Sequence, residues 1–332
     1  MRKYLVTGGL GFLGAALARA LLQSGHSVRI LDNGSRGSKE RLGPDQSQIE
    51  IIQADIRDAD AVSQAVRGVD VVCHLAFVNG TQFFYERPAH VLEVGVKGIV
   101  NVLDACIQAG VGELILASSS EVYQTPLVVP TDEHVPLSIP DPLNPRYSYA
   151  GGKIISELMA LNYGREHFDR VVIFRPHNVY GPNMGWEHVI PQFVSRLRKI
   201  QANAPDELIQ FPIQGSGRET RAFIYIVDFI DGLLRVIQHG EHLNIYNIGT
   251  SEELQIREVA SRVARCLGAH IHVVPGPVAG GGTHRRCPDI SKLKQLGFSS
   301  RFSFDAGLQP TVMWYAEHAK PGELVSDIKV PG

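Results

Sequence analysis

The first half of the chain alternates short apolar runs with helical patterns. The apolar runs are rich in Val, Ile and Leu, and they predict strands at 3–7, 27–31, 49–54, 69–75, 113–118 and 170–174. Helical periodicity predicts helices at 10–24, 88–109 and 147–167. Continuous apolar strands are typical of a parallel sheet that is buried on both faces. The alternating order therefore predicts an α/β fold with a doubly wound parallel (Rossmann) sheet.

This regular pattern weakens after Arg175. Loops rich in Gly, Pro and Asn occur at 177–185, 212–220 and 275–287. Two strands, at 222–226 and 243–248, are expected to flank a helix, and further helices are expected near 290–296 and 305–318. We therefore predict a Rossmann domain over 1–175 with a returning segment at about 222–248. A smaller C-terminal substrate-binding lobe is predicted over 176–221 and 249–332.

Composition excludes several classes of partner. The net charge of −2 over 332 residues, with Lys and Arg scattered, argues against nucleic acid or a membrane surface as a partner. No apolar run is long enough for a transmembrane helix or a signal peptide, so we expect a cytoplasmic protein. The four cysteines show neither CxxC nor metal-ligand spacing, and we expect reduced thiols and no metal.

A glycine-rich loop joins the first predicted strand to the first helix. Gly8, Gly11 and Gly14 form a G-x-x-G-x-x-G pattern in the segment TGGLGFLG. Glycine at such positions allows a tight turn, close approach of the backbone to a pyrophosphate, and close packing of helix on sheet. The free N–H groups at the helix N-terminus favour an anion. The alternative is a glycine-rich turn without a ligand.

Asp32 ends the second predicted strand, where a carboxylate can hold both ribose hydroxyls of an adenosine. A carboxylate would repel a 2′-phosphate, so the sequence favours NAD over NADP. Arg36, Lys39 and Arg41 follow closely and would suit such a phosphate. The alternative for Asp32 is an aspartate that begins a loop.

Tyr149 and Lys153 are four residues apart at the start of a predicted helix, and so share one face. An ammonium near a phenol stabilises the phenolate and lowers its pKa. Tyr149 could then exchange a proton with a sugar hydroxyl while hydride passes to or from a nicotinamide. Ser119, Ser120 and Glu121 follow the fifth strand, at the sheet edge where ligands bind in such folds. Glu121 is a candidate acid/base, or else a capping carboxylate.

Taken together, these residues resemble the extended short-chain dehydrogenase/reductases, specifically the nucleotide-sugar epimerase/dehydratase family. The resemblance covers essentially the whole chain. It is carried in family order by the glycine loop, Asp32-Asn33, Asp55-Ile56, His74-Leu75-Ala76, the serine run, Tyr149/Lys153, the segment 175–182, Arg221, Asp228 and the segment 285–292.

The resemblance implies roles for these positions. Cofactor contacts are implied for Gly8, Gly11, Phe12, Leu13, Gly14, Asp32, Asn33, Asp55, Ile56, Leu75, Ala76, Tyr149, Lys153 and Pro176. Substrate contacts are implied for Ser119, Ser120, Asn178, His177, His188, Arg221 and Arg286, with Arg221 and either Arg285 or Arg286 on the diphosphate. Catalysis is assigned to Tyr149, Lys153, Ser119 and Glu121. The long helices at 88–109 and 147–167 would pair across a homodimer as a four-helix bundle.

Departures from the family pattern reduce the number of reactions that the resemblance allows. Family 4,6-dehydratases carry Thr-Asp-Glu where this chain has Ser119-Ser120-Glu121, so the acid for dehydration is missing. UDP-glucuronate decarboxylases share the Ser-Glu pair, whereas UDP-galactose 4-epimerases share the serine run but lack the glutamate. Gly95 replaces an asparagine common in the family.

We therefore predict an NAD-dependent nucleotide-sugar epimerase that acts at C4 through a transient 4-keto intermediate, with its cofactor tightly bound. Two alternatives stay open. One is a decarboxylase or dehydratase of the same family, with Glu121 or His177 as acid/base. The other is a non-catalytic NAD-binding regulatory protein. The sequence leaves open which nucleotide-diphosphate sugar is the substrate.

Overall fold

The structure is a computed structural model that describes residues 1–203, 208–277 and 283–318. The centre of the predicted loop at 275–287 and the last part of the predicted C-terminal lobe, 319–332, lie outside the described residues.

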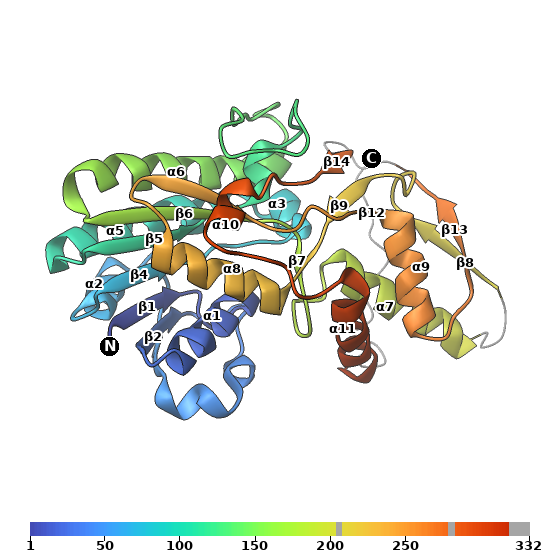
Figure 1. The fold of residues 1–332 in the computed structure, drawn as a ribbon, viewed down its shortest axis with the longest axis horizontal. Coiled ribbons are helices and arrows are strands. Elements are labelled where there is room, and N and C mark those ends of the chain that lie inside the picture. The colour runs from blue at the N-terminus through green and yellow to red at the C-terminus, as the bar shows by residue number, and fades with distance from the viewer. Residues whose placement is uncertain (204–207, 278–282, 319–332) are drawn as a thin grey trace.

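A seven-stranded parallel sheet forms the centre of the larger part of the molecule (Figure 1). Its order is β11-β6-β5-β4-β1-β2-β3, with every neighbouring pair parallel. The strands are β1 (Lys3–Thr7), β2 (Ser27–Asp32), β3 (Glu50–Gln53), β4 (Val71–His74), β5 (Glu113–Ala117), β6 (Arg170–Pro176) and β11 (Asn244–Ile248). The predicted doubly wound Rossmann sheet is confirmed.

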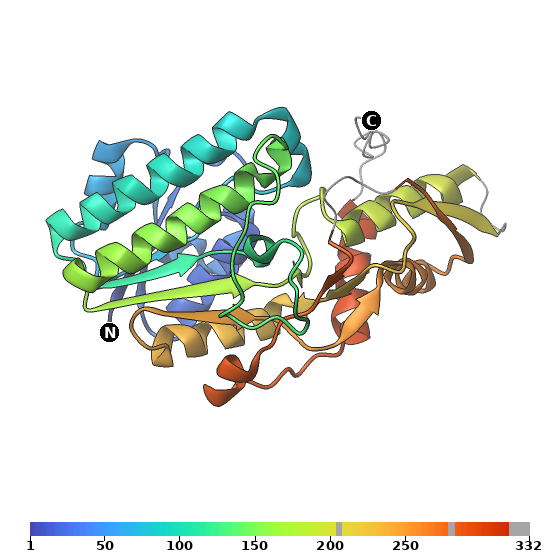
Figure 2. The same cartoon turned by 90° about the horizontal axis from the view of Figure 1, so that it is seen from above.

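Helices cover both faces of this sheet (Figures 1 and 2). One face carries α1 (Phe12–Gln23) and α8 (Ile226–His239), and the other carries α2 (Ala59–Val66), α5 (Gly98–Ala109) and α6 (Ser148–His167). Side chains alternate between the two cores as the pleat of a strand requires: Leu5 lies in the α5 core and Val6 in the α1 core. Burial on both faces explains why the strand sequences are apolar at consecutive positions.

The remaining elements surround a third core, centred on Tyr180, Phe193, Phe211 and Val259. They are β7 (Val179–Tyr180), α7 (Val189–Asn203), β8 (Ile209–Ile213), β9 (Thr220–Ala222), β10 (Ile224–Tyr225), β12 (Glu253–Gln255), α9 (Ile256–Cys266), β13 (Ile271–Pro275), β14 (Arg285–Arg286) and α11 (Phe304–His318). α10 (Ser291–Gln295) instead packs on α8 and β11. The division into a Rossmann domain and a substrate lobe stays a proposal.

Two predicted elements differ in the structure. The expected strand at 222–226 is split: β9 pairs with β12, β10 pairs with β7, and α8 begins at Ile226. Asn178 contacts both sides of the split: its side chain donates to the Ala222 carbonyl and its carbonyl accepts from the Ile224 N–H. The expected helix at 88–109 contains a π-helical turn, Glu93–Lys97, between α4 (Pro88–Leu92) and α5.

Short helices complete the connections near the carboxyl ends of the strands. They are α3 (Thr81–Glu86) after β4, and the 3-10 helices at Lys39–Gln48, Ser120–Tyr123 and Pro145–Tyr147. Among the described residues, no helix combines the length and apolar character that a membrane span needs.

Candidate active site

The glycine loop is fixed by direct contact between the ends of β1 and β4. The Thr7 hydroxyl accepts hydrogen bonds from the N–H groups of Leu75 and Ala76, both at 3.2 Å. Gly8 has φ +69°, and a Cβ there would lie 2.9 Å from the Ala76 Cα. Gly8 therefore tolerates no side chain, both because of its left-handed backbone and because of this close approach.

The N-terminus of α1 has the features of a pyrophosphate site. A Cβ on Gly14 would lie 2.2 Å from the Gly8 carbonyl oxygen, so Gly14 allows the helix to pack on the loop. A Cβ on Gly11 would meet only that same oxygen, at 3.2 Å. α1 begins without a side-chain cap and without an acidic residue in its first turn. Its free N–H groups and positive dipole end therefore suit an anion, and the residues present fit the diphosphate of NAD.

Asp32 is buried at the end of β2 and is held by two backbone groups. One carboxylate oxygen accepts from the Leu10 N–H at 3.0 Å and the other from the Gly34 N–H at 2.8 Å. Each oxygen can accept a further hydrogen bond, so both ribose hydroxyls can be bound. Asp55 and Asn33 lie beside each other at 3.1 Å, and the Arg57 guanidinium on Asp55 holds the pKa of that carboxyl well below its usual range.

Two of the basic residues after Asp32, Arg36 and Arg41, are engaged by protein groups. Arg41 donates to the carbonyls of Leu10, Arg36 and Asn183. Arg36 donates to the Asn79 carbonyl and pairs with Glu187, and so joins the loops after β2, β4 and β7. These contacts leave the NAD preference of Asp32 in place. His188, next to Glu187, is partly buried, and desolvation lowers its pKa to about 4.

Tyr149 lies on α6 between two aromatic rings. Phe84 stacks on its ring at 4.9 Å between centroids, and Phe77 meets it edge-on at 5.1 Å. The Ser119 side chain acts on the phenol and favours its charged form, which brings this predicted pair together. Burial nevertheless raises the pKa of Tyr149 to about 12. Phe77 and Phe84 exclude water from the phenol and so penalise its charged form.

The position of Lys153 differs from the expectation that its ammonium lies next to the Tyr149 phenol. Its ammonium donates to the Ala117 carbonyl at 2.6 Å and lies 4.2 Å from the centroid of the Phe77 ring, but 5.9 Å from that of Tyr149. The expected lowering of the tyrosine pKa by Lys153 is therefore not found in the chain alone. Desolvation instead lowers the pKa of Lys153 itself to about 7, against an opposing effect of Glu157.

Behind this pair lies a buried polar network that the sequence reasoning missed. Glu157 pairs with Arg175 through both carboxylate oxygens, at 2.8 and 2.6 Å, and also accepts from the Ser118 hydroxyl. Arg175 also donates a hydrogen bond of 2.7 Å to the Tyr123 hydroxyl. Glu157 follows Lys153 by four residues on the same helix face, and that spacing was the available signal.

Glu121 and Arg286 meet at the substrate side of the site. The two side chains form an ion pair of 2.5 Å, and the Arg286 side chain is 6% exposed. Desolvation opposes ionisation of Glu121, but Arg286 and then Arg146 and Arg221 more than compensate, so the pKa of Glu121 is lowered. Arg221 is partly buried, and desolvation followed by the nearby Arg286 lowers its pKa to about 10. Arg285, by contrast, is exposed and pairs with Glu253, outside this group.

His177 and Asn178 follow the end of β6, just after Pro176. His177 is fully buried, and its Nε2 lies 3.0 Å from the Asn247 side-chain oxygen, while its Nδ1 has no hydrogen-bond partner. Burial lowers its pKa to about 3, so the ring is neutral near pH 7. A neutral, buried imidazole can orient a group by hydrogen bonding but is a weak base. Ser120 is also buried, in the first turn of the short helix that Ser119 caps.

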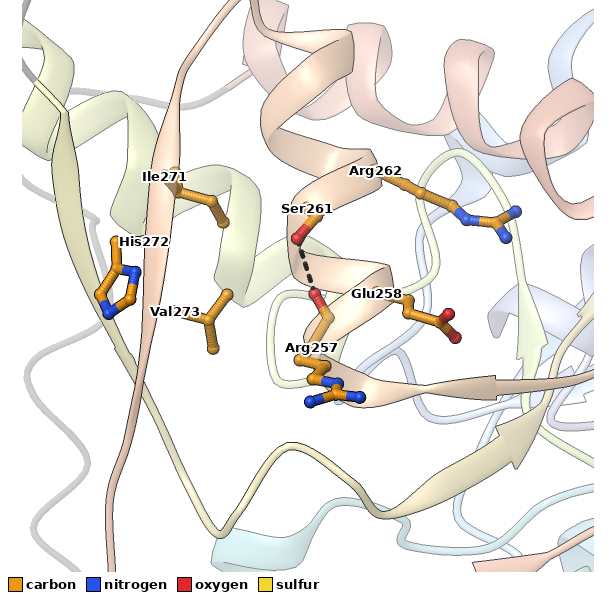
Figure 3. A pocket seen from close by; sticks show the side chains of 7 residues that line it. All are labelled: Arg257, Glu258, Ser261, Arg262, Ile271, His272 and Val273. Carbon is orange, nitrogen blue, oxygen red and sulfur yellow. Dashed lines mark hydrogen bonds between the residues drawn. The ribbon is translucent and has the colours of Figure 1, made fainter.

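A separate cavity of about 410 Å³ lies between α9 and β13, in the smaller part of the molecule (Figure 3). It is lined by Arg257, Glu258, Ser261, Arg262, Ile271, His272 and Val273, none of which the sequence predicted. Within 1–203, 208–277 and 283–318, no group of three or more His, Cys, Asp or Glu is arranged to hold a metal ion.

Comparison with known proteins gives a consistent result. The model of the NAD dependent epimerase/dehydratase family matches residues 4–249. The UDP-N-acetyl-alpha-D-glucosaminuronate decarboxylase of Bacillus cytotoxicus is 31% identical over 95% of this chain and 98% of the relative.

Solved structures agree over the same extent of chain. A dTDP-glucose 4,6-dehydratase from Streptomyces venezuelae, with NAD bound, has 31% identity and a TM-score of 0.84 over 95% of this chain and 97% of its own. A UDP-glucose 4-epimerase from Thermotoga maritima, with UDP-glucose, has 26% identity and a TM-score of 0.83 over 95% and 99%.

Proposed function

Because the chain belongs to the NAD-dependent epimerase/dehydratase family, we propose that it transiently oxidises C4 of a nucleotide-linked sugar. The observation that carries this proposal is the enclosure of the Tyr149 phenol by Phe77 and Phe84, with Lys153 and Ser119 beside it. Ser119 orients the C4 hydroxyl and Tyr149 takes its proton. Bound NAD supplies the acceptor for the two electrons of that carbon and later returns them. Since no net oxidation results, the cofactor stays bound through the cycle.

Among the fates of the resulting 4-ketone, the Glu121–Arg286 pair favours decarboxylation of a uronic acid. A 4-keto uronate is a β-keto acid, in which the C5–C6 bond breaks, carbon dioxide leaves, and the electron pair is taken up by the C4 carbonyl as an enolate. C5 is then protonated and the ketone is reduced. Arg286 offers a permanent charge for the substrate carboxylate. The similarity to a decarboxylase over nearly the whole of both chains supports the same fate.

Glu121 supplies the proton in this scheme. Without substrate, Arg286 holds Glu121 ionised. When the substrate carboxylate takes Arg286, Glu121 loses its partner and gains a like-charged neighbour, and both changes raise its pKa. Glu121 thereby becomes an acid only when a uronate is bound. When carbon dioxide leaves, the carboxylate of the substrate is gone, and Glu121 can give its proton to C5 at the moment when C5 carries the negative charge.

C4 epimerisation is the second candidate, and one observation favours it. Glu121 is ionised in the chain alone, and a 4-epimerase needs no acid beyond Tyr149 and Lys153. In that case the 4-keto sugar turns over in the site and is reduced on its other face. The 26% identity to a solved 4-epimerase agrees with this candidate.

The test is incubation of the purified enzyme with UDP-, dTDP-, GDP- and CDP-sugars, including uronic acids, followed by mass spectrometry and NMR. Loss of carbon dioxide from a uronate supports decarboxylation, whereas an inverted ring proton at unchanged mass supports epimerisation and overturns our preference. Tyr149→Phe should reduce turnover by about 1,000-fold while NAD binding persists. Absence of turnover on every sugar would favour a non-catalytic NAD-binding role.

We also propose the remaining assignments. Asn178, His177, His188 and Arg221 contact the substrate, and a homodimer forms through α5 and α6, which lie side by side (Figure 2). The α6 side chains of Ile155 and Leu158 are 39% and 57% exposed, as a helix face awaiting a partner would be. Leu158→Lys should convert a dimer to a monomer in light scattering, and an unchanged mass would argue against this interface.

A further inference from the structure

The Phe77 ring occupies a notch formed by two glycines on different elements. Phe77 follows Ala76 in the loop after β4. A Cβ on Gly95, in the π-helical turn, would lie 2.2 Å from the Phe77 Cζ atom, and a Cβ on Gly152, in α6, would lie 2.9 Å from the same atom. The tip of the ring therefore fits only because both positions lack a side chain.

The notch presents the face of the ring to the Lys153 ammonium. The Nζ atom lies 4.2 Å from the ring centroid, well within the distance for a cation–π interaction. The same ring meets Tyr149 edge-on, with an interplanar angle of 82°. One aromatic side chain therefore contacts both members of the Tyr149–Lys153 pair.

We propose that Phe77, seated between Gly95 and Gly152, is a positioning residue that holds the Lys153 ammonium in place against the Ala117 carbonyl. This proposal rests on the proposed function only in assuming that Lys153 takes part in turnover. Any side chain on Gly95 would displace the ring.

The surroundings of Lys153 explain why the contact with the Phe77 ring stabilises the ammonium. Lys153 is 4% exposed, and desolvation lowers its pKa to about 7. The titratable groups that face it are Tyr149 and Glu157 on α6 and His74 on β4, whose own pKa Lys153 lowers. Glu157 opposes the desolvation of Lys153 but is itself held by Arg175. The negative face of the Phe77 ring adds stabilisation of the ammonium that these groups do not supply.

The experiment follows Lys153 directly, by NMR titration of the ε-13C-lysine-labelled full chain without substrate. Lys153→Met assigns the signal. Phe77→Leu keeps an apolar side chain but removes the ring face, and should lower the titration midpoint by about one pH unit. Gly95→Ala displaces the ring and should give the same shift, while the double variant should shift no further than either. Phe84→Leu, which removes the other ring packed on Tyr149, should leave the midpoint in place.

An unmoved midpoint in both Phe77→Leu and Gly95→Ala overturns the proposal, as does an equal shift in Phe84→Leu. If Phe77→Leu does not fold, Gly95→Ala decides alone. The titration needs no substrate, so a failure of every nucleotide-sugar to react would count against the proposed function only. On a reacting substrate, the basic limb of the kcat profile should move to lower pH in Phe77→Leu, whereas a merely structural role would lower the rate at every pH equally.

Discussion

The two ends of the proposed active site are built from contacts of different range. At the cofactor end, the Leu10 N–H reaches Asp32 across 22 positions of sequence, and the glycine loop lies within one strand–turn–helix unit. At the substrate end, Glu121 and Arg286 are separated by 165 positions, and Thr283 donates to the Gln124 carbonyl across 159. The hydrogen bonds of the glycine loop and of Asp32 span at most the 69 positions between Thr7 and Ala76, while the second end exists only once the whole chain has folded.

The largest effect is expected at the substrate end. Arg286→Met leaves the Glu121 carboxylate without its partner, which should lower the free energy of unfolding by about 2 kcal/mol. Turnover should fall by about 100-fold or more, because in the proposed decarboxylation the carboxylate of the uronic acid also loses its partner. The double variant Glu121→Gln/Arg286→Met should recover stability in urea unfolding but not activity. Recovery of both would mean that the pair is only structural.

An intermediate effect is expected at the cofactor end, where two glycines of one motif should behave differently. Gly11→Ala adds a methyl group that meets only the Gly8 oxygen, so the fold should persist while NAD affinity falls by roughly tenfold or more. Gly14→Ala places its methyl group against backbone atoms of Gly8 and Gly9, and should lower the melting temperature as well. Calorimetric titration with NAD and thermal unfolding separate the two, and equal melting temperatures would contradict this division of roles.

The smallest effect concerns histidines, one from each end. Burial lowers the pKa of His74 and of His177 to about 3, while the unfolded chain titrates near 6.5. Between these values the unfolded state binds more protons, so stability is present at pH 7 and is lost as the pH falls below about 6.5. His74→Gln or His177→Gln should each flatten this decline by about 1–2 kcal/mol between pH 7 and pH 5.

Urea unfolding at several pH values measures this decline. Equal flattening in the two variants is expected because burial sets both pKa values, whichever end the residue belongs to. A decline as steep as that of the parent chain in His177→Gln would show that the ring titrates in the folded protein near its unfolded value of about 6.5.

The sequence predicted those features that depend on near neighbours. The strands of the parallel sheet, the glycine loop and the shared face of Tyr149 and Lys153 follow from periodicity and spacing. The split of 222–226 does not follow from periodicity, and there Asn178 binds the Ala222 carbonyl from another segment. The predicted lowering of the Tyr149 pKa was wrong as well. The two rings that desolvate the phenol lie in the loop after β4 and in α3, far from Tyr149 in the sequence.

The interleaved order of the sheet has a consequence for biosynthesis. β11 pairs with β6, yet residues 177–243 must be made between them, including α7 and much of the smaller part of the molecule. On the ribosome, β6 therefore emerges with an unpaired edge that persists until residue 248 has left the exit tunnel. Asn247, which contacts His177, arrives on that same last strand. A nascent chain paused before this point would display an open sheet edge, and so should be a ligand for chaperones that capture unpaired strands.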